Sequence, residues 1–522
     1  MRGDEPAFRR HRLPTSLPFA APLRAQGLGG VESREPEMAV GTKTTIRRAT
    51  ATLLCCATAL AFAQQAHASG LYFSERGVRP LARGGAFTAG ADDLGAIYYN
   101  PAGLADAGTQ ILADMSWVNF SSDYQRRSRL EQVDPNTGQF TGTVWERTHP
   151  SVQGTSPVLP IPTLAASTNF GQENVNFAFG LWAPYAAIPT YPETLDNGEP
   201  APQRHSLLSL GGSALAVLGA WGAWKASPEL SLGAGIEVLA GDFNAEVVLN
   251  TCPPDRLACA PEDPAYDAKA QLKAGTIIAP SGNAGLIYAP SKDVRFGASF
   301  QLPFWIDAPA KVRVRLPSST LFDEASVSGE DARVKFRLPW VLRTGIEYRG
   351  FSNTRIELGF VYEAWSMHDA IVATPENIAL ENVLGIDYRV GSISLDRGFK
   401  DSYSIRLGGE YALALGDYRL DLRAGAMYET SAIPKSHLSV MTLDLDKVIA
   451  SIGGSLHLNR RLRLDAVYAR VIGFATEVST SEAAITQVNP IKANPPESRT
   501  AVNAGSYAAR ADVIGLGLAY NF

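Results

Sequence analysis

The chain has 522 residues, and its 47 Lys and Arg against 52 Asp and Glu give a formal net charge of −5. This slightly acidic balance gives no support for a nucleic-acid partner. The length suffices for one large barrel or for two to three ordinary domains. Patterns along the chain must therefore decide between these two organisations.

A targeting signal is predicted near the N-terminus. Lys43 and Arg47 precede an uncharged, largely apolar stretch at 49–63, and small residues flank His67 in front of Ser69. This arrangement is typical of a secretory signal peptide, here spanning residues 38–68. The apolar stretch is shorter than the roughly 20 residues of a membrane-spanning helix. We therefore expect export with cleavage after position 68 rather than a retained anchor.

Residues 1–37 fit no part of this signal. They are rich in Arg and Pro and lie upstream of a plausible start at Met38. We interpret them as an extension produced by a misassigned start codon.

The next segment, 69–108, is dense in Gly and Ala and lacks regular alternation. Residues 92–99 could form one or two helical turns, which should end at Asn100 because proline at the next position disfavours helix there. A compact N-terminal piece ahead of a barrel is most economically placed inside it. We therefore predict a hatch over 69–108 that plugs a barrel over 109–522.

Two-residue alternation dominates the remaining chain. Apolar and charged or small residues alternate at 311–316, 355–362, 405–411, 418–423 and 461–468. In a transmembrane barrel the apolar face meets lipid and the other face lines the lumen. We accordingly place the charged residues of these strands in the lumen. A soluble β-sandwich would alternate as well, with its apolar face inside, so alternation alone does not orient the sheet.

The last nine residues supply an orientation signal. Large side chains occupy every second position from Ile514 to Phe522, while the intervening positions are Gly515, Gly517, Ala519 and Asn521. Such a strand ending in Tyr520 and Phe522 resembles the signal recognised by the outer-membrane barrel assembly machinery. Together with the signal peptide, it predicts an outer-membrane location in a Gram-negative-type bacterium, surrounded by lipid and lipopolysaccharide.

Segments rich in turn-forming residues separate the strands. Those at 185–204, 251–267 and 375–400 are predicted to be extracellular loops. Cys252 and Cys259 lie close together in the second loop and are expected to form a disulfide in an oxidising compartment. A metal pair is the weaker alternative, because no His or further Cys lies nearby.

One apolar segment, 207–224, has the composition of a possible helix. It contains many Gly and Ala residues and two tryptophans near its end, and we expect a strand plus a turn. With strands of roughly 10 residues, the chain could build about a dozen to sixteen of them.

A family resemblance arises from the segment Arg83–Leu104, which has the sequence RGGAFTAGADDLGAIYYNPAGL. It resembles the hatch signature of the FadL-type outer-membrane transporters of long-chain fatty acids and aromatic hydrocarbons. Weaker matches follow in the expected order at 362–366, 401–411 and 502–507. The resemblance implies an all-β, monomeric barrel of about fourteen strands with a hatch at its periplasmic side. It also implies passive uptake of hydrophobic ligands through an apolar pocket and a hatch rearrangement, with long-chain fatty acids as the expected cargo.

The resemblance and the residue types together suggest a site. The gating residues would be Asn100, Pro101, Ala102, Gly103 and Leu104. The candidate aromatic ligand contacts are Trp182, Tyr185, Phe304, Trp305 and Trp365, for which an interfacial aromatic girdle is the alternative role. Arg355, Arg406 and Arg423 could hold a carboxylate head group, although charge ladders with neighbouring acidic residues would equally explain them.

Two other functional classes stay open at this point, an outer-membrane lipid hydrolase and a surface receptor or adhesin. No nucleophile elbow, phosphate loop or zinc signature is recognisable in the sequence. We therefore expect no enzymatic activity, no metal and no cofactor. The long loops would be the functional part of a receptor.

Overall fold

The computed structural model describes residues 74–522 except 135–136, 138–139, 159, 184–188, 253–261, 369, 397 and 491–500. The chain divides into two compact units, 1–62 and 63–522, and only the second contains described residues. The predicted N-terminal extension and signal peptide lie outside the described residues. The description that follows concerns the second unit.

Fourteen antiparallel strands close into a barrel, because β23 pairs back with β1. This confirms the predicted fold class. In order around the ring, the strands are β1 (Gln110–Val133), β3 (Pro160–Thr168), β4 (Val175–Trp182), β5 (Ala214–Lys225), β6 (Leu230–Asn250), β7 (Asp267–Tyr288), β8 (Val294–Gln301), β12 (Val341–Tyr348), β13 (Thr354–Glu363), β18 (Ser402–Leu415), β19 (Tyr418–Glu429), β20 (Lys447–His457), β21 (Leu462–Gly473) and β23 (Gly505–Asn521). Segment 207–224 contains a turn followed by β5, as the sequence predicts.

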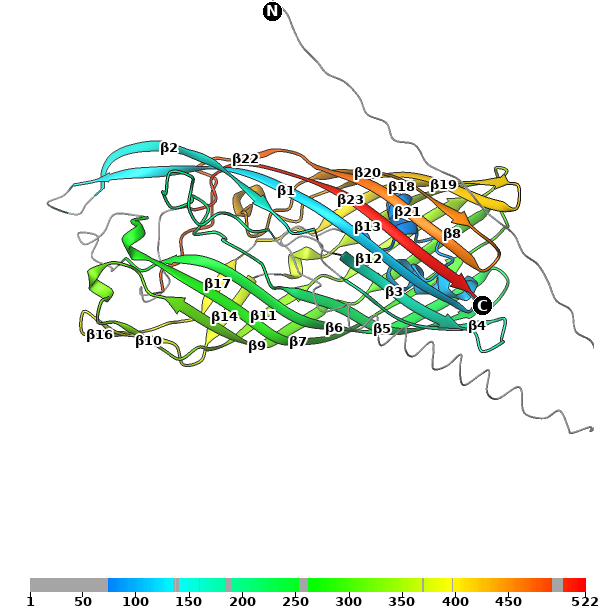
Figure 1. Cartoon of the computed structure of the whole chain (residues 1–522), viewed down its shortest axis with the longest axis horizontal. Helices are drawn as coiled ribbons and strands as arrows, with labels where there is room; N and C mark the ends of the chain where they lie inside the picture. The colour runs from blue at the N-terminus through cyan, green and yellow to red at the C-terminus, as the bar shows by residue number, and fades with distance from the viewer. Residues whose placement is uncertain are drawn as a thin grey trace, which may run out of the picture. The chain divides into compact units, whose positions relative to one another are not determined.

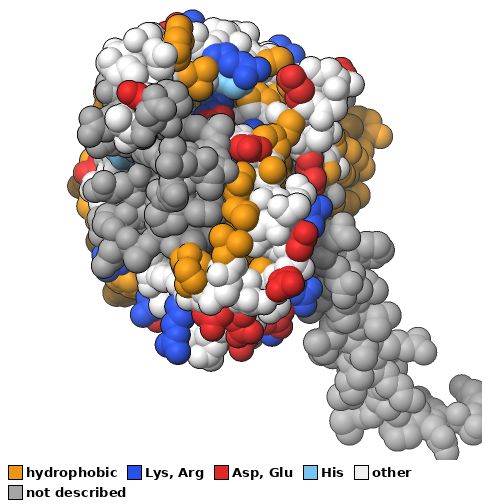
Figure 2. All heavy atoms as spheres, turned by 90° about the vertical axis from the view of Figure 1, so that its left-hand side faces the viewer, with side chains coloured by type: hydrophobic (Ala, Val, Ile, Leu, Met, Phe, Trp, Pro, Cys, Tyr) orange, Lys and Arg blue, Asp and Glu red, His pale blue; other side chains and the backbone are white. Residues whose placement is uncertain are grey.

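Further strands extend the barrel wall away from the C-terminus, at what we call the loop end (Figure 1). They are β2 (Phe140–Thr155), β9 (Phe304–Arg315), β11 (Asp331–Leu338), β14 (Ala370–Pro375), β17 (Ile393–Asp396) and β22 (Thr476–Val478). A separate small sheet contains β10 (Ser326–Ser328), β15 (Ala379–Val383) and β16 (Ile386–Arg389). Figure 2, which faces the loop end, shows acidic and basic side chains spread around the rim with hydrophobic side chains between them.

The helices are short. They are α2 (Val78–Ala82), α3 (Ala96–Tyr99), and the 3-10 turns η1 (Pro101–Asp106), η2 (Pro264–Tyr266), η3 (Thr320–Phe322), η4 (Trp365–Met367) and η5 (Lys435–His437). Within the described ranges, no helix is long and apolar enough to cross a membrane.

The barrel wall near the hatch carries an apolar outer surface. Ile346, Leu358, Leu407 and Ile514 all face outward and are about half exposed. The alternate positions of the same strands are buried and face the lumen. This is the pattern that a strand between lipid and lumen requires, since only its outer face meets hydrocarbon.

The pattern reverses in β9 and β11. On β9, Lys311 and Arg313 are exposed on the outer face, whereas Ile306 and Ala308 are buried inside. The prediction that the charges of segment 311–316 face the lumen is therefore wrong. Outward-facing cations are costly in hydrocarbon, so β9 and β11 extend beyond the membrane belt.

Prolines lie at the boundary where the inward-facing and outward-facing positions exchange their polarity. Leu302 and Pro303 separate β8 from β9, and Pro339 and Trp340 separate β11 from β12. Proline has no backbone N–H to give to a ladder, so it occurs where strand pairing is interrupted. The inner faces of β9 and β11 are consequently apolar, whereas the lumen of the membrane belt is polar.

Residues 74–108 occupy that polar lumen near the end where the C-terminus lies (Figure 1). Helix α2 packs on β19, β20, β21 and β23, while η1 packs on β4, β5, β6 and β7 on the opposite side of the ring. The segment, called the hatch from here on, therefore spans the lumen from wall to wall. Nearly all of its residues up to Leu104 are buried.

Candidate functional site

A single carboxylate of the barrel wall holds one turn of the hatch. The backbone N–H groups of Thr88, Ala89 and Gly90 donate to Glu357 at 2.7, 2.9 and 2.9 Å. Arg83 of the hatch lies 3.2 Å from the same carboxylate. Both charged side chains are fully buried. Hydrogen bonds to a charged acceptor are stronger than neutral ones, so Glu357 fixes this part of the hatch to β13.

A second cluster surrounds two consecutive aspartates of the hatch. Arg355 of β13 contacts Asp92 at 2.7 Å, and Arg463 of β21 contacts Asp93 at 2.9 Å. Arg79, also in the hatch, bridges both aspartates. Burial alone would raise the pKa of Asp92, but the guanidinium groups of Arg355 and Arg79 hold it well below its usual range. The cluster thus stays ionised and joins the hatch to two separate strands.

The arginines predicted to hold a head group all have carboxylate partners. Arg355 contacts Asp92, and Arg406 contacts Glu75 of the hatch at 2.8 Å. Arg423 instead contacts Glu410 of the neighbouring strand at 2.6 Å. Two of the three therefore attach the hatch, and their role toward a ligand head group stays a prediction.

The predicted gating residues form the start of η1. Asn100 caps this turn, because its side-chain oxygen accepts from the N–H of Ala102 at 3.1 Å. Its amide group donates to the carbonyl oxygens of Thr88 at 2.9 Å and of Leu286 in β7 at 3.0 Å. Asn100 thereby links the turn, the preceding hatch segment and the barrel wall.

The other members of the motif fill a tight space. Pro101 stands at the first position of η1, where its missing N–H costs nothing. Ala102 and Leu104 are completely buried. At Gly103, a Cβ atom would lie 2.6 Å from the carbonyl oxygen of Ala91, so the backbone approach requires glycine.

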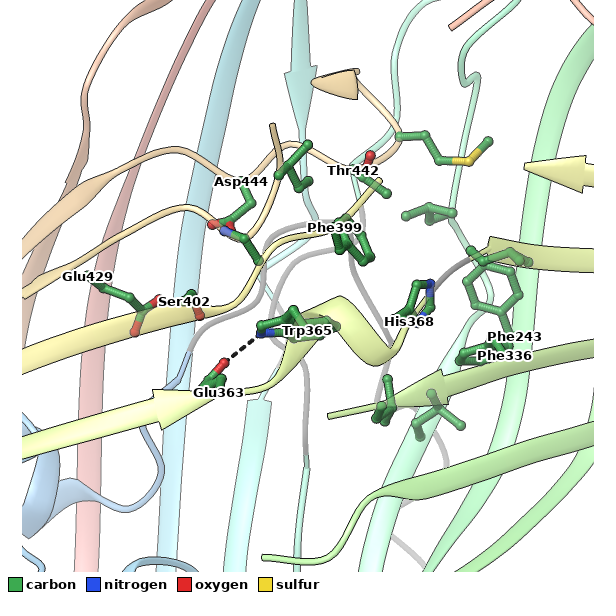
Figure 3. Close-up of a pocket in the computed structure, with 17 residues that line it drawn as sticks. Phe243, Phe336, Glu363, Trp365, His368, Phe399, Ser402, Glu429, Thr442 and Asp444 are labelled. Atoms are coloured by element: carbon green, nitrogen blue, oxygen red, sulfur yellow. Dashed lines mark hydrogen bonds between the residues drawn. The ribbon is translucent and has the colours of Figure 1, made fainter. Parts of the chain in front are cut away.

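A pocket with a cavity volume of about 130 Å³ lies farther toward the loop end (Figure 3). On β13 the inward-facing residues run from Glu357 at the hatch through Gly359 and Val361 to Glu363 at the pocket. The apolar lining consists of Leu210, Leu215, Phe243, Phe336, Leu338, Trp365, Ile371, Phe399, Ala432, Ile433 and Met441. The polar lining consists of Glu363, His368, Ser402, Glu429, Thr442 and Asp444.

Part of the polar lining and part of the aromatic lining lie on different sides of the pocket. Figure 3 shows Glu363, Ser402 and Glu429 together on one side, and Phe243 and Phe336 on the other. The pocket therefore offers an apolar volume with one polar end. Binding sites for small molecules commonly combine these two features.

Among the predicted aromatic contacts, Trp365 lines this pocket, and its indole N–H donates to Glu363 at 2.7 Å. Trp182 is buried against Tyr98 of the hatch, with ring centroids 4.9 Å apart. Phe304 is buried on the inner face of β9, whereas Trp305 points outward and is 56% exposed. Tyr185 lies outside the described residues.

Several functional candidates were missed from the sequence. Glu363 lies within the matched segment 362–366, but the sequence gives no indication of its role at a pocket. Phe336 and Phe399 belong to separate segments and reach the pocket only through the tertiary fold. Glu357 is one of the neighbouring acidic residues that could balance the arginines in a charge ladder, but in the structure its carboxylate accepts hydrogen bonds from the hatch backbone.

The remaining predicted residues lie away from the pocket. Cys252 is disulfide-bonded, while Cys259 lies outside the described residues. Tyr520 and Phe522 contact one another at the barrel end, with ring centroids 5.0 Å apart. Among the residues that the structure describes, no group of three or more His, Cys, Asp or Glu is arranged to hold a metal ion.

A closed barrel with an apolar outer belt, a lumen filled by its own N-terminal segment and an apolar pocket beside that segment defines a plugged membrane-barrel channel. The chain belongs to the family described as outer membrane protein transport protein (OMPP1/FadL/TodX), which matches residues 59–522. This family comprises outer-membrane barrels of Gram-negative bacteria that transport hydrophobic compounds, and they are channels rather than enzymes.

Solved structures support the fold. A Pseudomonas aeruginosa FadL homologue is similar with a TM-score of 0.64 at 14% identity, covering 87% of this chain and 100% of the other. The toluene transporters TodX of P. putida and TbuX of Ralstonia pickettii give TM-scores of 0.55 and 0.52, each at 15% identity with 86% and 99% coverage. No curated protein matches the sequence of this chain.

Proposed function

We propose that this protein takes up hydrophobic small molecules passively across the outer membrane. The ligand enters from the loop end, occupies the apolar pocket and moves on when the hatch rearranges. The observation that carries the proposal is the position of this pocket in the lumen, on the loop-end side of a hatch that ion pairs fasten to the wall.

The physical chemistry of the two lumen sections supports this order of events. The apolar lining of the pocket favours an apolar solute by about 0.8 kcal/mol per buried methylene. The polar lumen around the hatch offers no such gain. A ligand therefore accumulates in the pocket and leaves it when the hatch moves.

Long-chain fatty acids are the cargo predicted from the sequence, and aromatic hydrocarbons are the second candidate. The toluene transporters TodX and TbuX, which have a similar fold, lend weight to the second. Both cargoes share the long or flat apolar surface that the pocket would bury. Uptake of each is therefore measured separately.

The test uses the full chain in a host that lacks its own transporter of this family. Accumulation of labelled oleate and of labelled toluene is compared between the wild type and the Asn100→Ala/Pro101→Ala double variant. The double variant loses the three hydrogen bonds of Asn100. We expect uptake to fall about tenfold or more while the barrel still inserts, as shown by its heat-modifiable mobility on a gel.

Trp305→Ala serves as the matched control, because this side chain points out of the lumen. Its uptake should equal that of the wild type. Normal uptake by the inserted double variant would remove the gating role from this motif. Absence of both cargoes from wild-type cells, combined with lipid hydrolysis by the purified protein, would replace the transport proposal by the hydrolase alternative.

A further inference from the structure

The polar end of the pocket is acidic. Glu363, Glu429 and Asp444 line it, and among the described lining residues none is Lys or Arg. Ser402 adds a hydroxyl group at this end. The sequence-based expectation of an arginine beside a ligand carboxylate therefore does not describe this pocket.

The charges near these carboxylates are already engaged. Lys447 contacts Glu429 at 2.6 Å and Asp444 at 2.8 Å, so one cation serves two carboxylates. Two arginines on the hatch side contact the hatch, and their positive charges also act on Glu363. Arg343 lies 4.4 Å from the ring centroid of Tyr98, and Arg406 contacts Glu75.

Glu363 is the carboxylate best placed for a ligand. It is 4% exposed, borders the pocket directly and accepts a hydrogen bond from Trp365. A carboxylate has several acceptor sites and no donor when it is ionised, so it can take a further hydrogen bond from a ligand. A second carboxylate brought beside it would meet a like charge in a poorly solvated place.

The other side of the pocket is aromatic. Phe336 and His368 lie with ring centroids 6.0 Å apart, His368 and Phe399 4.9 Å, and Phe399 and Trp365 5.6 Å. At these separations the rings contact one another, so together they form an aromatic wall against which a further flat ring could pack. The pocket thus combines an aromatic wall with hydrogen-bond acceptors at one end.

From this arrangement we infer that the pocket selects apolar ligands that carry an uncharged hydroxyl group on or near an aromatic ring, such as alkylphenols, and discriminates against the corresponding carboxylates. The hydroxyl donates to Glu363, and the ring and alkyl chain occupy the aromatic side. This inference rests on the proposed uptake function and specifies its substrate class.

The test measures equilibrium binding to the mature, purified barrel in mild detergent at pH 8. The probes are 4-butylphenol, 4-butylbenzoate and butylbenzene, which share a ring and a chain and differ in the polar group. We expect the phenol to bind at least about tenfold more tightly than the benzoate, a factor that one lost charged hydrogen bond can produce. Butylbenzene should bind with intermediate affinity.

The Glu363→Gln variant tests whether Glu363 causes the preference for the phenol over the benzoate. It keeps the shape and removes the charge, so the ratio between phenol and benzoate should shrink to within about threefold while butylbenzene binding stays the same. Glu330→Gln is the matched control, because Glu330 lies in an exposed ion pair with Lys311 outside the pocket. This control should leave all three affinities unchanged.

The outcomes separate the two proposals. Failure of butylbenzene to bind the wild type would argue against the pocket as a transport site and thus against the proposed function. Binding of butylbenzene together with equal affinity for phenol and benzoate would overturn only the inference on the polar group. An unchanged ratio in Glu363→Gln, with butylbenzene still bound, would remove Glu363 from the selection.

Discussion

The buried carboxylate of Glu357 holds the hatch, so a substitution of Glu357 is the clearest single-residue test of how the hatch is fixed to the barrel. Its four contacts reach Arg83 and three consecutive backbone N–H groups at 88–90. Removing one member of a buried charged pair typically costs about 3–5 kcal/mol, because the partner is left uncompensated. The partner left behind here would be Arg83, which would keep Glu347 as a carboxylate partner at 3.0 Å, so we expect a loss at the lower end of this range.

We therefore expect Glu357→Ala to loosen the hatch without unfolding the barrel. Hydrogen exchange followed by mass spectrometry should show faster exchange in peptides that cover 83–90, and unchanged exchange in β20 and β21. Glu330→Ala, which removes an exposed carboxylate, should change neither region. Unaltered exchange at 83–90 in Glu357→Ala would mean that the remaining ion pairs suffice to hold the hatch.

The elements that surround the hatch are strands with small residues on their inner face. On β18, Gly408 faces the lumen and an added Cβ atom would lie 2.2 Å from the carbonyl oxygen of Arg83. Its neighbour Gly409 has only Arg355 nearby, with the carbonyl oxygen at 3.7 Å. Two adjacent glycines of one strand thus have different roles, because successive side chains point to opposite faces.

This difference gives a matched pair of substitutions. Gly408→Ala should displace the hatch and raise the single-channel conductance in planar bilayers, whereas Gly409→Ala should keep the wild-type conductance. Cβ contacts below 3 Å force one of the two backbones to move, and the hatch is the element without ladder hydrogen bonds. Equal conductance in both variants would show that the barrel wall yields in place of the hatch.

The ion pairs of Asp92 also predict that the docking of the hatch in the lumen depends on pH. Because the neighbouring arginines hold the pKa of Asp92 well below its usual range, the ionised aspartate stabilises the docked hatch. This stabilisation is complete above the ordinary aspartate pKa of about 4 and is lost as the pH falls toward the lowered value. A nitroxide label on Ala105→Cys should therefore show constant mobility from about pH 5 to 8 and rising mobility below about pH 4.

Asp92→Asn supplies the control for this titration. It should give high label mobility already at neutral pH, with little further change on acidification. A pH response of the same size in Asp92→Asn would assign the effect to other groups, for example Asp93.

At the scale of the whole molecule, the sequence predicted the fold far better than the pocket. Alternation identified strands such as β13 and β23, because side-chain period is a local property. It could not tell which face of β9 meets water, since an extension beyond the membrane alternates in the same way with the faces exchanged. The pocket brings together residues as far apart in the sequence as Leu210 and Asp444, which no local pattern connects. Phe304 and Trp305 are adjacent on β9, and the alternation of side chains alone decides that the first points inward and the second outward.

The reversal of polarity between β12 and β9 defines where the membrane belt ends, and it leads to a last prediction. Ile346 of β12 and Trp305 of β9 both point outward and are about half exposed, but only Ile346 lies within the apolar belt. Arginine on the lipid face costs about 2–4 kcal/mol at the midplane and about 0–1 kcal/mol near the interface. Ile346→Arg should thus lower the free energy of unfolding in lipid vesicles by about 2 kcal/mol or more, whereas Trp305→Arg should change it by less than about 1 kcal/mol. Equal losses of unfolding free energy in the two variants would place β9 inside the hydrocarbon. A water-exposed outer face would then no longer explain why the inner face of β9 is apolar.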